Sequence, residues 1–287
     1  SVNFNYKDAI GCAVGGSGTI LKTIDAGTTW NIKSSGTTNS LYSISFTDSS
    51  NGYVAGDLGT ILNTITAGEI WTSQTSNTTK KLYSIDFASA TTGYATGESG
   101  TILKTTNKGV NWIIQTTGIN NMTTLESIYF VNANTGFAVG ESGTILKTSN
   151  GGTNWNLMKN WTSLLSSYEA IVFTGQDTGY VVGSLGTILK TTNNGKNWSN
   201  QPSGTDEVLN SIYFTDSKTG YVVGNSGTIL KTTNGGLSWQ SQQSWTFDNL
   251  FSTRFTDANT GFAVGDFGTI LKTTDGGQNW ILCSTPN

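Results

Sequence analysis

Hydrophobic and polar positions follow one order that recurs about every 41 residues along the chain. Each repeat has an x-Ile-x-Phe segment, as in Ser211–Phe214, and then Gly-aromatic-x-x-Gly, as in Gly220–Gly224. Gly-Thr-Ile-Leu follows, as in Gly227–Leu230, and then a tryptophan such as Trp239. These runs are short, β-branched or aromatic, and bounded by Gly, Asn, Asp or Ser, which predicts strands.

The tryptophans that end the repeats show that the order occurs seven times: Trp30, Trp71, Trp112, Trp155, Trp198, Trp239 and Trp280. A fixed period of this length predicts a solenoid or a propeller. Four short strands per repeat, without a helical stretch, favour a propeller blade. We therefore predict an all-β fold in which residues 1–287 form a single seven-bladed β-propeller domain. Each blade is expected to be one contiguous repeat of 41–43 residues with four antiparallel strands.

The sixth repeat illustrates the four strands, which we name A to D in chain order. The predicted ranges are Leu209 to Phe214 for A, Tyr221 to Val223 for B, Thr228 to Thr232 for C, and a strand D that starts at Trp239. In the first blade, strand A is predicted at Val2 to Phe4. In the last blade, strand D is predicted to follow Trp280.

An Asp or Asn stands in the turn between strands C and D in six repeats: Asp25, Asn107, Asn150, Asn193, Asn234 and Asp275. Asn-Gly and Asp-Gly tolerate the positive φ that tight hairpin turns need. Their side chains can also accept backbone N–H bonds within the turn. Because the device recurs along the chain, it indicates scaffold rather than an active-site loop. The second repeat departs from it, with Thr66 at this position.

Composition excludes several classes of function. The 287 residues include no histidine, which excludes Ser-His-Asp and Cys-His catalysis and histidine-ligated zinc. Two cysteines are too few for a Cys-rich zinc site, so we expect neither a metal nor a cofactor. The net charge of −3 argues against nucleic acid, and no apolar run could span a membrane. A surface rich in Ser, Thr, Asn and Gly predicts a secreted or periplasmic monomer.

The repeat also resembles known propellers. Thr273 to Trp280 resembles the Asp-box of sialidase-type and sortilin-type propellers. The whole unit, Phe-x-Asp-x-x-x-Gly-Tyr-x-x-Gly-x-x-Gly-Thr-Ile-Leu-Lys-Thr-x-Asn-Gly-Gly-x-x-Trp, resembles the photosystem II stability and assembly factor propellers. That family also includes many secreted bacterial proteins. The resemblance covers all seven repeats and implies a propeller in which the Asp-box is a structural turn.

Arginine content separates this chain from the functions of those families. The photosynthetic members bind a reaction-centre subunit through an arginine patch, and sialidases hold a carboxylate with an arginine cluster. This chain has a single arginine, Arg254. The resemblance therefore predicts the fold and leaves both of these roles unsupported.

Loop lengths indicate which face of the propeller binds a partner. The D-to-A connections carry nearly all the length variation, and they share one face with the B-to-C turns. Two off-pattern tryptophans lie in these connections: Trp161, and Trp245 close to Phe247. We predict that they contact a sugar ring or a partner side chain. The alternative is that each folds back over the core as a cap.

Acidic residues recur at one position of the B-to-C turns: Asp57, Glu98, Glu141 and Asp266. One interpretation is attraction of a cation or amine, or a glycosidase pair, which needs two carboxylates about 5–10 Å apart. The alternative, which we favour, is a solvated acidic rim.

Two hypotheses for function follow. The first is a non-catalytic binding or scaffold propeller that captures a protein or peptide on the face formed by the D–A and B–C loops. The alternative is a carbohydrate-binding propeller or glycan-active enzyme that uses the loop tryptophans and acids. The first is preferred because no catalytic constellation is present.

Cys12 and Cys283 fall in the first and last repeats, the two blades that must meet. A disulfide between them would close a loop of some 270 residues and stabilise the fold by up to about 5 kcal/mol. The alternative is two unrelated thiols, since strand B and strand D are expected at different depths in a blade.

Overall fold

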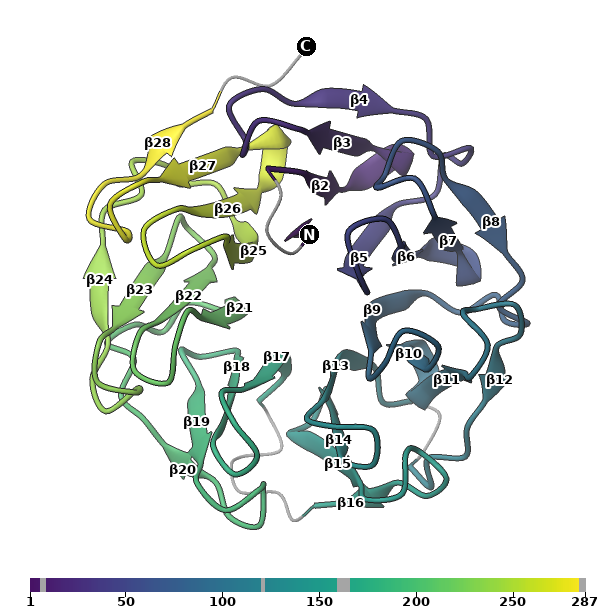
Figure 1. The fold of residues 1–287 in the computed structure, drawn as a ribbon. Helices are drawn as coiled ribbons and strands as arrows, with labels where there is room; N and C mark the ends of the chain where they lie inside the picture. The colour runs from purple at the N-terminus through teal and green to yellow at the C-terminus, as the bar shows by residue number, and fades with distance from the viewer. Residues whose placement is uncertain (6–8, 120–121, 159–165, 284–287) are drawn as a thin grey trace. The chain divides into compact units, whose positions relative to one another are not determined.

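The computed structural model describes residues 1–5, 9–119, 122–158 and 166–283. Within these residues, 28 strands form seven four-stranded antiparallel sheets, each with its strands in chain order (Figure 1). The helical content of these ranges is four 3₁₀ turns of three residues each, and no helix among them could cross a membrane. The fold is the predicted all-β seven-bladed propeller, with one sheet per blade.

Blades one to four belong to one compact unit. Its strands are β1 (Val2–Phe4), β2 (Gly11–Val14), β3 (Ile20–Thr23), β4 (Asn31–Lys33), β5 (Leu41–Phe46), β6 (Gly52–Gly56), β7 (Ile61–Thr64), β8 (Thr72–Gln74), β9 (Leu82–Phe87), β10 (Gly93–Gly97), β11 (Thr101–Thr105), β12 (Ile113–Ile114), β13 (Leu125–Phe130), β14 (Gly136–Gly140), β15 (Thr144–Thr148) and β16 (Asn156–Leu157). Three 3₁₀ turns join strands B and C: η1 (Gly16–Gly18), η2 (Asp57–Gly59) and η3 (Glu98–Gly100).

Blades five to seven belong to a second compact unit. Its strands are β17 (Tyr168–Phe173), β18 (Gly179–Gly183), β19 (Ile188–Thr191), β20 (Ser199–Asn200), β21 (Leu209–Phe214), β22 (Gly220–Gly224), β23 (Ile229–Thr232), β24 (Gln240–Gln242), β25 (Leu250–Phe255), β26 (Gly261–Gly265), β27 (Ile270–Thr273) and β28 (Ile281–Leu282). One 3₁₀ turn, η4 (Asp266–Gly268), joins β26 and β27.

An aromatic cluster between neighbouring blades explains the recurring Phe, Tyr and Trp. The strand A phenylalanine meets its own blade's tryptophan edge to face, at 6.0 Å for Phe255 and Trp280. Tyr221, on strand B of the preceding blade, stacks on Phe255 at 3.9 Å. Edge-to-face and stacked pairs add to the free energy that burial itself provides. The same triad recurs at Tyr94, Phe130 and Trp155.

A pair of hydrogen bonds to one carbonyl oxygen of the next blade, here called the lock, accompanies each of these clusters. The Tyr221 hydroxyl and the Lys231 ammonium both donate to the carbonyl oxygen of Gly276 in the next blade, at 2.7 and 2.6 Å. Tyr94 and Lys104 donate in the same way to the Gly151 carbonyl oxygen of the next blade. Tyr180 and Lys190 donate to the Gly235 carbonyl oxygen of the next blade. The recurring strand C lysine therefore stabilises the contact between blades.

The first blade replaces this lock, because Cys12 stands where the other blades have tyrosine or phenylalanine. Lys22 instead pairs with Glu69 of the second blade at 2.9 Å. The Cys12 thiol is buried in the cluster with Trp71, so it faces the second blade. Neither Cys12 nor Cys283 forms a disulfide in the structure, and the predicted pairing is absent.

The C-to-D turns differ from the prediction in which residues carry positive φ. Positive φ falls on the two residues after it, at 69° for Gly235 and 74° for Gly236, rather than on Asn234 itself. The Asn234 side chain accepts the N–H of Ser238 and the hydroxyl of Thr232. Its role in the turn is that of a hydrogen-bond acceptor.

Two of these turns carry an ionised acceptor, and we predict that they make stability sensitive to acid. Hydrogen bonds from Thr29 lower the pKa of Asp25 to about 2, and those from Asn279 lower the pKa of Asp275 to about 2. Because the unfolded-state pKa is near 4, this contribution is present above about pH 4 and is lost between about pH 4 and pH 2.

The double substitution Asp25→Asn and Asp275→Asn keeps an acceptor oxygen in each turn. Its urea unfolding midpoint should fall less between about pH 4 and pH 2 than that of the parent chain. The reverse control, Asn150→Asp with Asn234→Asp, should fall more. Parallel pH profiles for all three proteins would contradict the assignment.

A buried hydroxyl on strand B yields a second prediction. Thr96 is fully buried, and its hydroxyl has no hydrogen-bond partner, whereas five other blades have valine at this position. Thr96→Val should therefore raise the free energy of unfolding by about 1–2 kcal/mol in urea titrations. Thr253 is the matched control, because its buried hydroxyl donates to the Phe262 carbonyl at 2.9 Å. Thr253→Val should be destabilising, and a loss of stability in Thr96→Val would refute the argument.

Candidate functional site

Loops of two kinds meet at one end of each blade. The Gly227 N–H, in a B–C turn, donates to Asp248 O in the following D–A connection at 2.9 Å. At the other end the A–B and C–D turns meet, as where the Gly235 N–H donates to Lys218 O at 2.8 Å. We call these two ends the D–A/B–C face and the A–B/C–D face.

The B–C turn brings its backbone against the D–A connection. Gly227 has φ of 68°, and a Cβ there would lie 2.0 Å from the Thr246 carbonyl oxygen, so only glycine fits. The same close approach is present at Gly18, Gly59 and Gly186, and the glycine of every Gly-Thr-Ile-Leu has positive φ. The residue before it also has positive φ and is exposed in most blades, as in Leu58, Leu185 and Phe267.

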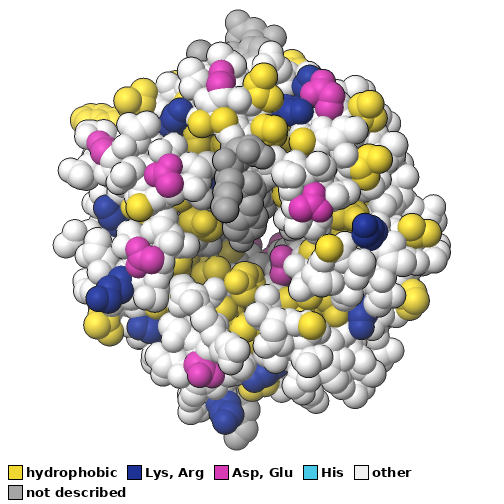
Figure 2. All heavy atoms as spheres, in the orientation of Figure 1, with side chains coloured by type: hydrophobic (Ala, Val, Ile, Leu, Met, Phe, Trp, Pro, Cys, Tyr) yellow, Lys and Arg dark blue, Asp and Glu magenta, His cyan; other side chains and the backbone are white. Residues whose placement is uncertain are grey.

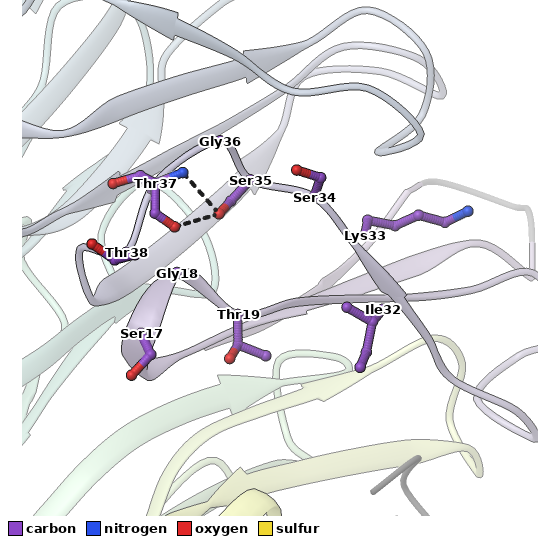
Figure 3. A pocket seen from close by; sticks show the side chains of 10 residues that line it. All are labelled: Ser17, Gly18, Thr19, Ile32, Lys33, Ser34, Ser35, Gly36, Thr37 and Thr38. Atoms are coloured by element: carbon purple, nitrogen blue, oxygen red, sulfur yellow. Dashed lines mark hydrogen bonds between the residues drawn. The ribbon is translucent and has the colours of Figure 1, made fainter.

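The space beside these turns forms a shallow groove in the first two blades. In blade one it has a volume of about 620 Å³ and is lined by Ser17–Thr19 and Ile32–Thr38 (Figure 3). The Ser35 hydroxyl donates to the Thr37 carbonyl oxygen and accepts the Thr37 N–H, which closes the loop. Leu58–Thr60 and Ser73–Lys80 line the same groove in blade two. Its wide opening makes it a surface feature rather than an enclosed active site.

The D–A connection of blade six places aromatic rings at matching positions. Ser244 makes the same two bonds with Thr246 as Ser35 makes with Thr37. Trp245 and Phe247 therefore stand where blade one has Gly36 and Thr38, and they are 80% and 93% exposed. Neither forms a cap over the core. Trp161, predicted to act in the same way, lies outside the described residues.

Hydrogen bonds hold the blade-six connection between two B–C turns. Asn249 accepts the Ser226 N–H and donates to the Asp266 carboxylate at 3.0 Å. Asp248 accepts the hydroxyl of Thr269. This connection is therefore bonded to the turns of both blade six and blade seven, where Phe267 is 95% exposed.

The predicted acidic residues all begin B–C turns, and none is deeply buried. Asp57 accepts the Tyr42 hydroxyl at 2.9 Å and lies 3.9 Å from the Lys81 ammonium. Glu98 accepts the backbone N–H of Lys81 at 3.1 Å. Lys81, in the connection between blades two and three, thus contacts an acid of each of these blades.

A position on strand A was missed by sequence reasoning, although it lies next to these acids. It is the second residue of the strand, occupied by Tyr42, Tyr83, Glu126, Glu169, Asn210 and Phe251. Asn210 donates to Asn225, the first residue of its B–C turn, at 2.9 Å, as Tyr42 does to Asp57. The available signal was variability, because this residue changes class between repeats whose neighbouring residues are nearly constant.

Two tyrosines at this position lie together in the first unit. The rings of Tyr42 and Tyr83 are 5.1 Å apart and tilted by 42°. Burial, together with the neighbouring Asp57 carboxylate, raises the pKa of Tyr42 to about 12. The hydroxyl therefore stays protonated at neutral pH and acts as a donor.

Glu169 is the carboxyl group of this set whose pKa rises. Burial raises it, with a smaller contribution from the charge of Glu141 and an opposing hydrogen bond from Ser167. General acid catalysis uses a carboxyl group whose pKa is raised in this way. Among the described residues, no group of three or more His, Cys, Asp or Glu side chains could hold a metal ion.

Charge is dispersed on the face that Figure 2 shows. Figure 2 shows acidic side chains spread singly among mostly uncharged ones on the face in view. Arg254 lies on strand A of blade seven and stacks over the Tyr213 ring at 4.7 Å. A cluster of arginines for carboxylate recognition is absent from the sequence.

Comparison with known families gives a match along nearly the whole chain. The family model described as Photosynthesis system II assembly factor YCF48 matches residues 2–65, 63–205 and 200–285. No curated protein matches the sequence at a significant level.

Solved structures of similar fold include two YCF48 proteins. One, described as YCF48 bound to D1 peptide, is 18% identical, with a TM-score of 0.76 over 96% of this chain and 94% of its own. YCF48 from Cyanidioschyzon merolae is 19% identical, with a TM-score of 0.78 and the same coverage. A GH74 enzyme from Niastella koreensis is 14% identical, with a TM-score of 0.79. This chain covers 53% of that enzyme, and the likeness is one of fold.

The backbone at Trp245 leads to a stability prediction. Trp245 has φ of 61°, where blades one, three and five have Gly36, Gly118 and Gly204. A bulky residue in this region is strained. Trp245→Gly should therefore raise the free energy of unfolding by about 0.5–1 kcal/mol, after allowing for the greater freedom of glycine in the unfolded chain.

The matched control for that substitution is Gly204→Trp. A Cβ at Gly204 would have open space around it, so backbone strain is the main cost, and this variant should unfold at lower urea. If Trp245→Gly unfolds at lower urea than the parent, the side chain stabilises the folded loop and the strain argument is wrong.

Proposed function

This chain belongs to the photosynthesis system II assembly factor YCF48 family, and from that membership we propose a non-catalytic protein that captures a protein or peptide partner. The proposed binding surface is the D–A/B–C face. The observation that carries this is a pair of exposed aromatic rings on that face. Trp245 and Phe247 are 80% and 93% exposed, at positions where blade one has Gly36 and Thr38.

A related propeller with a bound peptide supports the proposal. YCF48 has been solved with D1 peptide, and its fold covers nearly all of this chain. The identity of 18% leaves the partner of this chain open. The arginine patch that the resemblance implies for photosynthetic members has no counterpart here, so we infer a different partner.

Glycan binding or cleavage is the second candidate. It is favoured by exposed Trp245, since aromatic rings stack on sugars, and by the raised pKa of Glu169 beside Glu141. Incubation with a panel of polysaccharides, followed by detection of reducing ends, tests cleavage. Release of sugar that disappears in Glu169→Gln would favour this candidate over the first.

We further propose that the protein acts outside the cytoplasm, as a monomer. The composition supports this location, with 36 glycines and only 15 lysine and arginine residues in 287. Fractionation of the native cells and light scattering of the purified chain test the two statements.

The proposed function predicts that partner capture depends on one face. Trp245→Gly with Phe247→Thr should reduce the amount of recovered partner at least tenfold in pull-downs, because the contact rings are removed. Lys196→Ser with Lys218→Ser, on the A–B/C–D face, should leave capture unchanged. Equal loss from both pairs, without a change in thermal melts, would count against the assigned face.

A structural variant separates binding from folding. Trp112 is 1% exposed and packs edge to face on Phe87. Trp112→Ala should lose about 3–5 kcal/mol of stability, as core truncations of this size do. This variant should fail to capture the partner only at temperatures at which its thermal melt shows unfolding.

A further inference from the structure

The D–A/B–C face of blades five to seven combines exposed aromatic rings with carboxylates. We propose that residues 201–208, 243–249 and 265–269, here called the aromatic–acidic surface, bind a peptide segment that carries apolar side chains together with lysine or arginine. The inference rests on the proposed function and specifies the chemistry of the partner.

The aromatic part of the surface is unusually exposed. Trp245, Phe247 and Phe267 have 80%, 93% and 95% of their surface accessible, although large aromatic side chains normally gain free energy by burial. They stand on loops that are hydrogen-bonded to one another through Asn249. Exposed apolar side chains grouped on adjoining loops mark an interaction site.

The loops are also fixed before any partner arrives. Trp245 and Phe267 both have positive φ, and the Asp248 and Asn249 bonds hold the connection against its neighbours. Rings on a rigid backbone lose little conformational entropy on binding, so they suit the role of anchors. A connection that served only to join two strands would need neither ring, as glycine and threonine show in blade one.

The charge of the surface selects the partner. Its loops contain four carboxylates, Asp206, Glu207, Asp248 and Asp266, and no lysine or arginine. Within the described residues, none of these four makes an ion pair, and the side-chain bonds to Asp248 and Asp266 come from the neutral donors Thr269 and Asn249. Their negative charge is therefore uncompensated and available to attract cations.

This combination narrows the chemistry of the occupant. Anionic lipids and nucleic acids would be repelled by the carboxylates. A neutral glycan could stack on the rings, but it offers no charge to complement the acids. A cationic peptide with aromatic or aliphatic side chains satisfies both features, since its apolar groups cover the rings while its ammonium or guanidinium groups meet the carboxylates.

Fluorescence anisotropy with defined peptides tests the proposal. Four labelled 15-residue peptides would be compared. The first combines leucine and phenylalanine with lysine, and the second combines them with glutamate. The third contains lysine without apolar residues, and the fourth is a neutral polar sequence. The intact chain should bind the first at least tenfold more tightly than the other three. Its affinity should fall as salt is raised, because screening weakens the charge contribution.

Substitutions taken from sister blades remove each feature without disturbing the turns. The triple variant W245G, F247T and F267S carries residues that other blades have at the same positions. It should bind the first peptide at least tenfold more weakly. D206N, E207Q, D248N and D266N should weaken it and abolish the salt dependence. Leu237→Thr, an exposed apolar residue on the A–B/C–D face of blade six, is the matched control and should bind normally.

The outcomes separate this inference from the proposed function. Tight binding of the glutamate peptide, equal binding of all four, or binding insensitive to both sets of substitutions would overturn the aromatic–acidic surface. If Tyr42→Ser with Tyr83→Ser loses a captured native partner while the aromatic and acidic variants keep it, the D–A/B–C face would stand and the aromatic–acidic surface would not. If the chain binds only a neutral glycan, and the aromatic triple variant loses that binding, the peptide assignment would be overturned for this surface and for the proposed function.

Discussion

In three blades the contact with the next blade includes one carbonyl oxygen shared by two donors. In blades three, five and six a strand B tyrosine and a strand C lysine donate to the same glycine carbonyl of the next blade's C–D turn. That carbonyl is presented only if the turn residues adopt positive φ and if Asp or Asn accepts the turn's N–H groups. The tyrosine ring can reach it only by stacking on the next strand A phenylalanine. In these blades the recurring tyrosine, lysine, phenylalanine and turn glycines thus serve one interaction between blades.

The lock occupies the C–D turns, and the opposite end of the blades also carries side chains that change from blade to blade. There the glycine of Gly-Thr-Ile-Leu is fixed by the nearby D–A carbonyl, but the residue before it and the second residue of strand A are free to differ. Tyr42, Glu169 and Phe251 occupy the same strand position with different chemistry. Membership of an assembly-factor family, together with this division, supports a rigid scaffold that presents a specific surface to a partner.

The scaffold was predictable because each of its elements repeats, and the surface was less so because its elements do not. Strand A of blade six lies at Leu209–Phe214 as predicted, and strand D begins one residue after Trp239. Sequence patterns could not reveal that the two glycines after Asn234, rather than Asn234 itself, carry positive φ, nor that Cys12 faces the second blade. Trp245 and Phe247 were found because they break the repeat, whereas Tyr42 was missed because tyrosine is ordinary in a strand.

Hydrogen exchange measured by mass spectrometry, with and without the captured partner, tests the central claim most directly. The claim is that the D–A/B–C face binds and the A–B/C–D face only holds the blades together. The account predicts new protection in peptides covering residues 201–208, 243–249 and 265–269, with unchanged exchange in the C–D turns around Asn234 and Asp275. Protection confined to the C–D and A–B turns would contradict it.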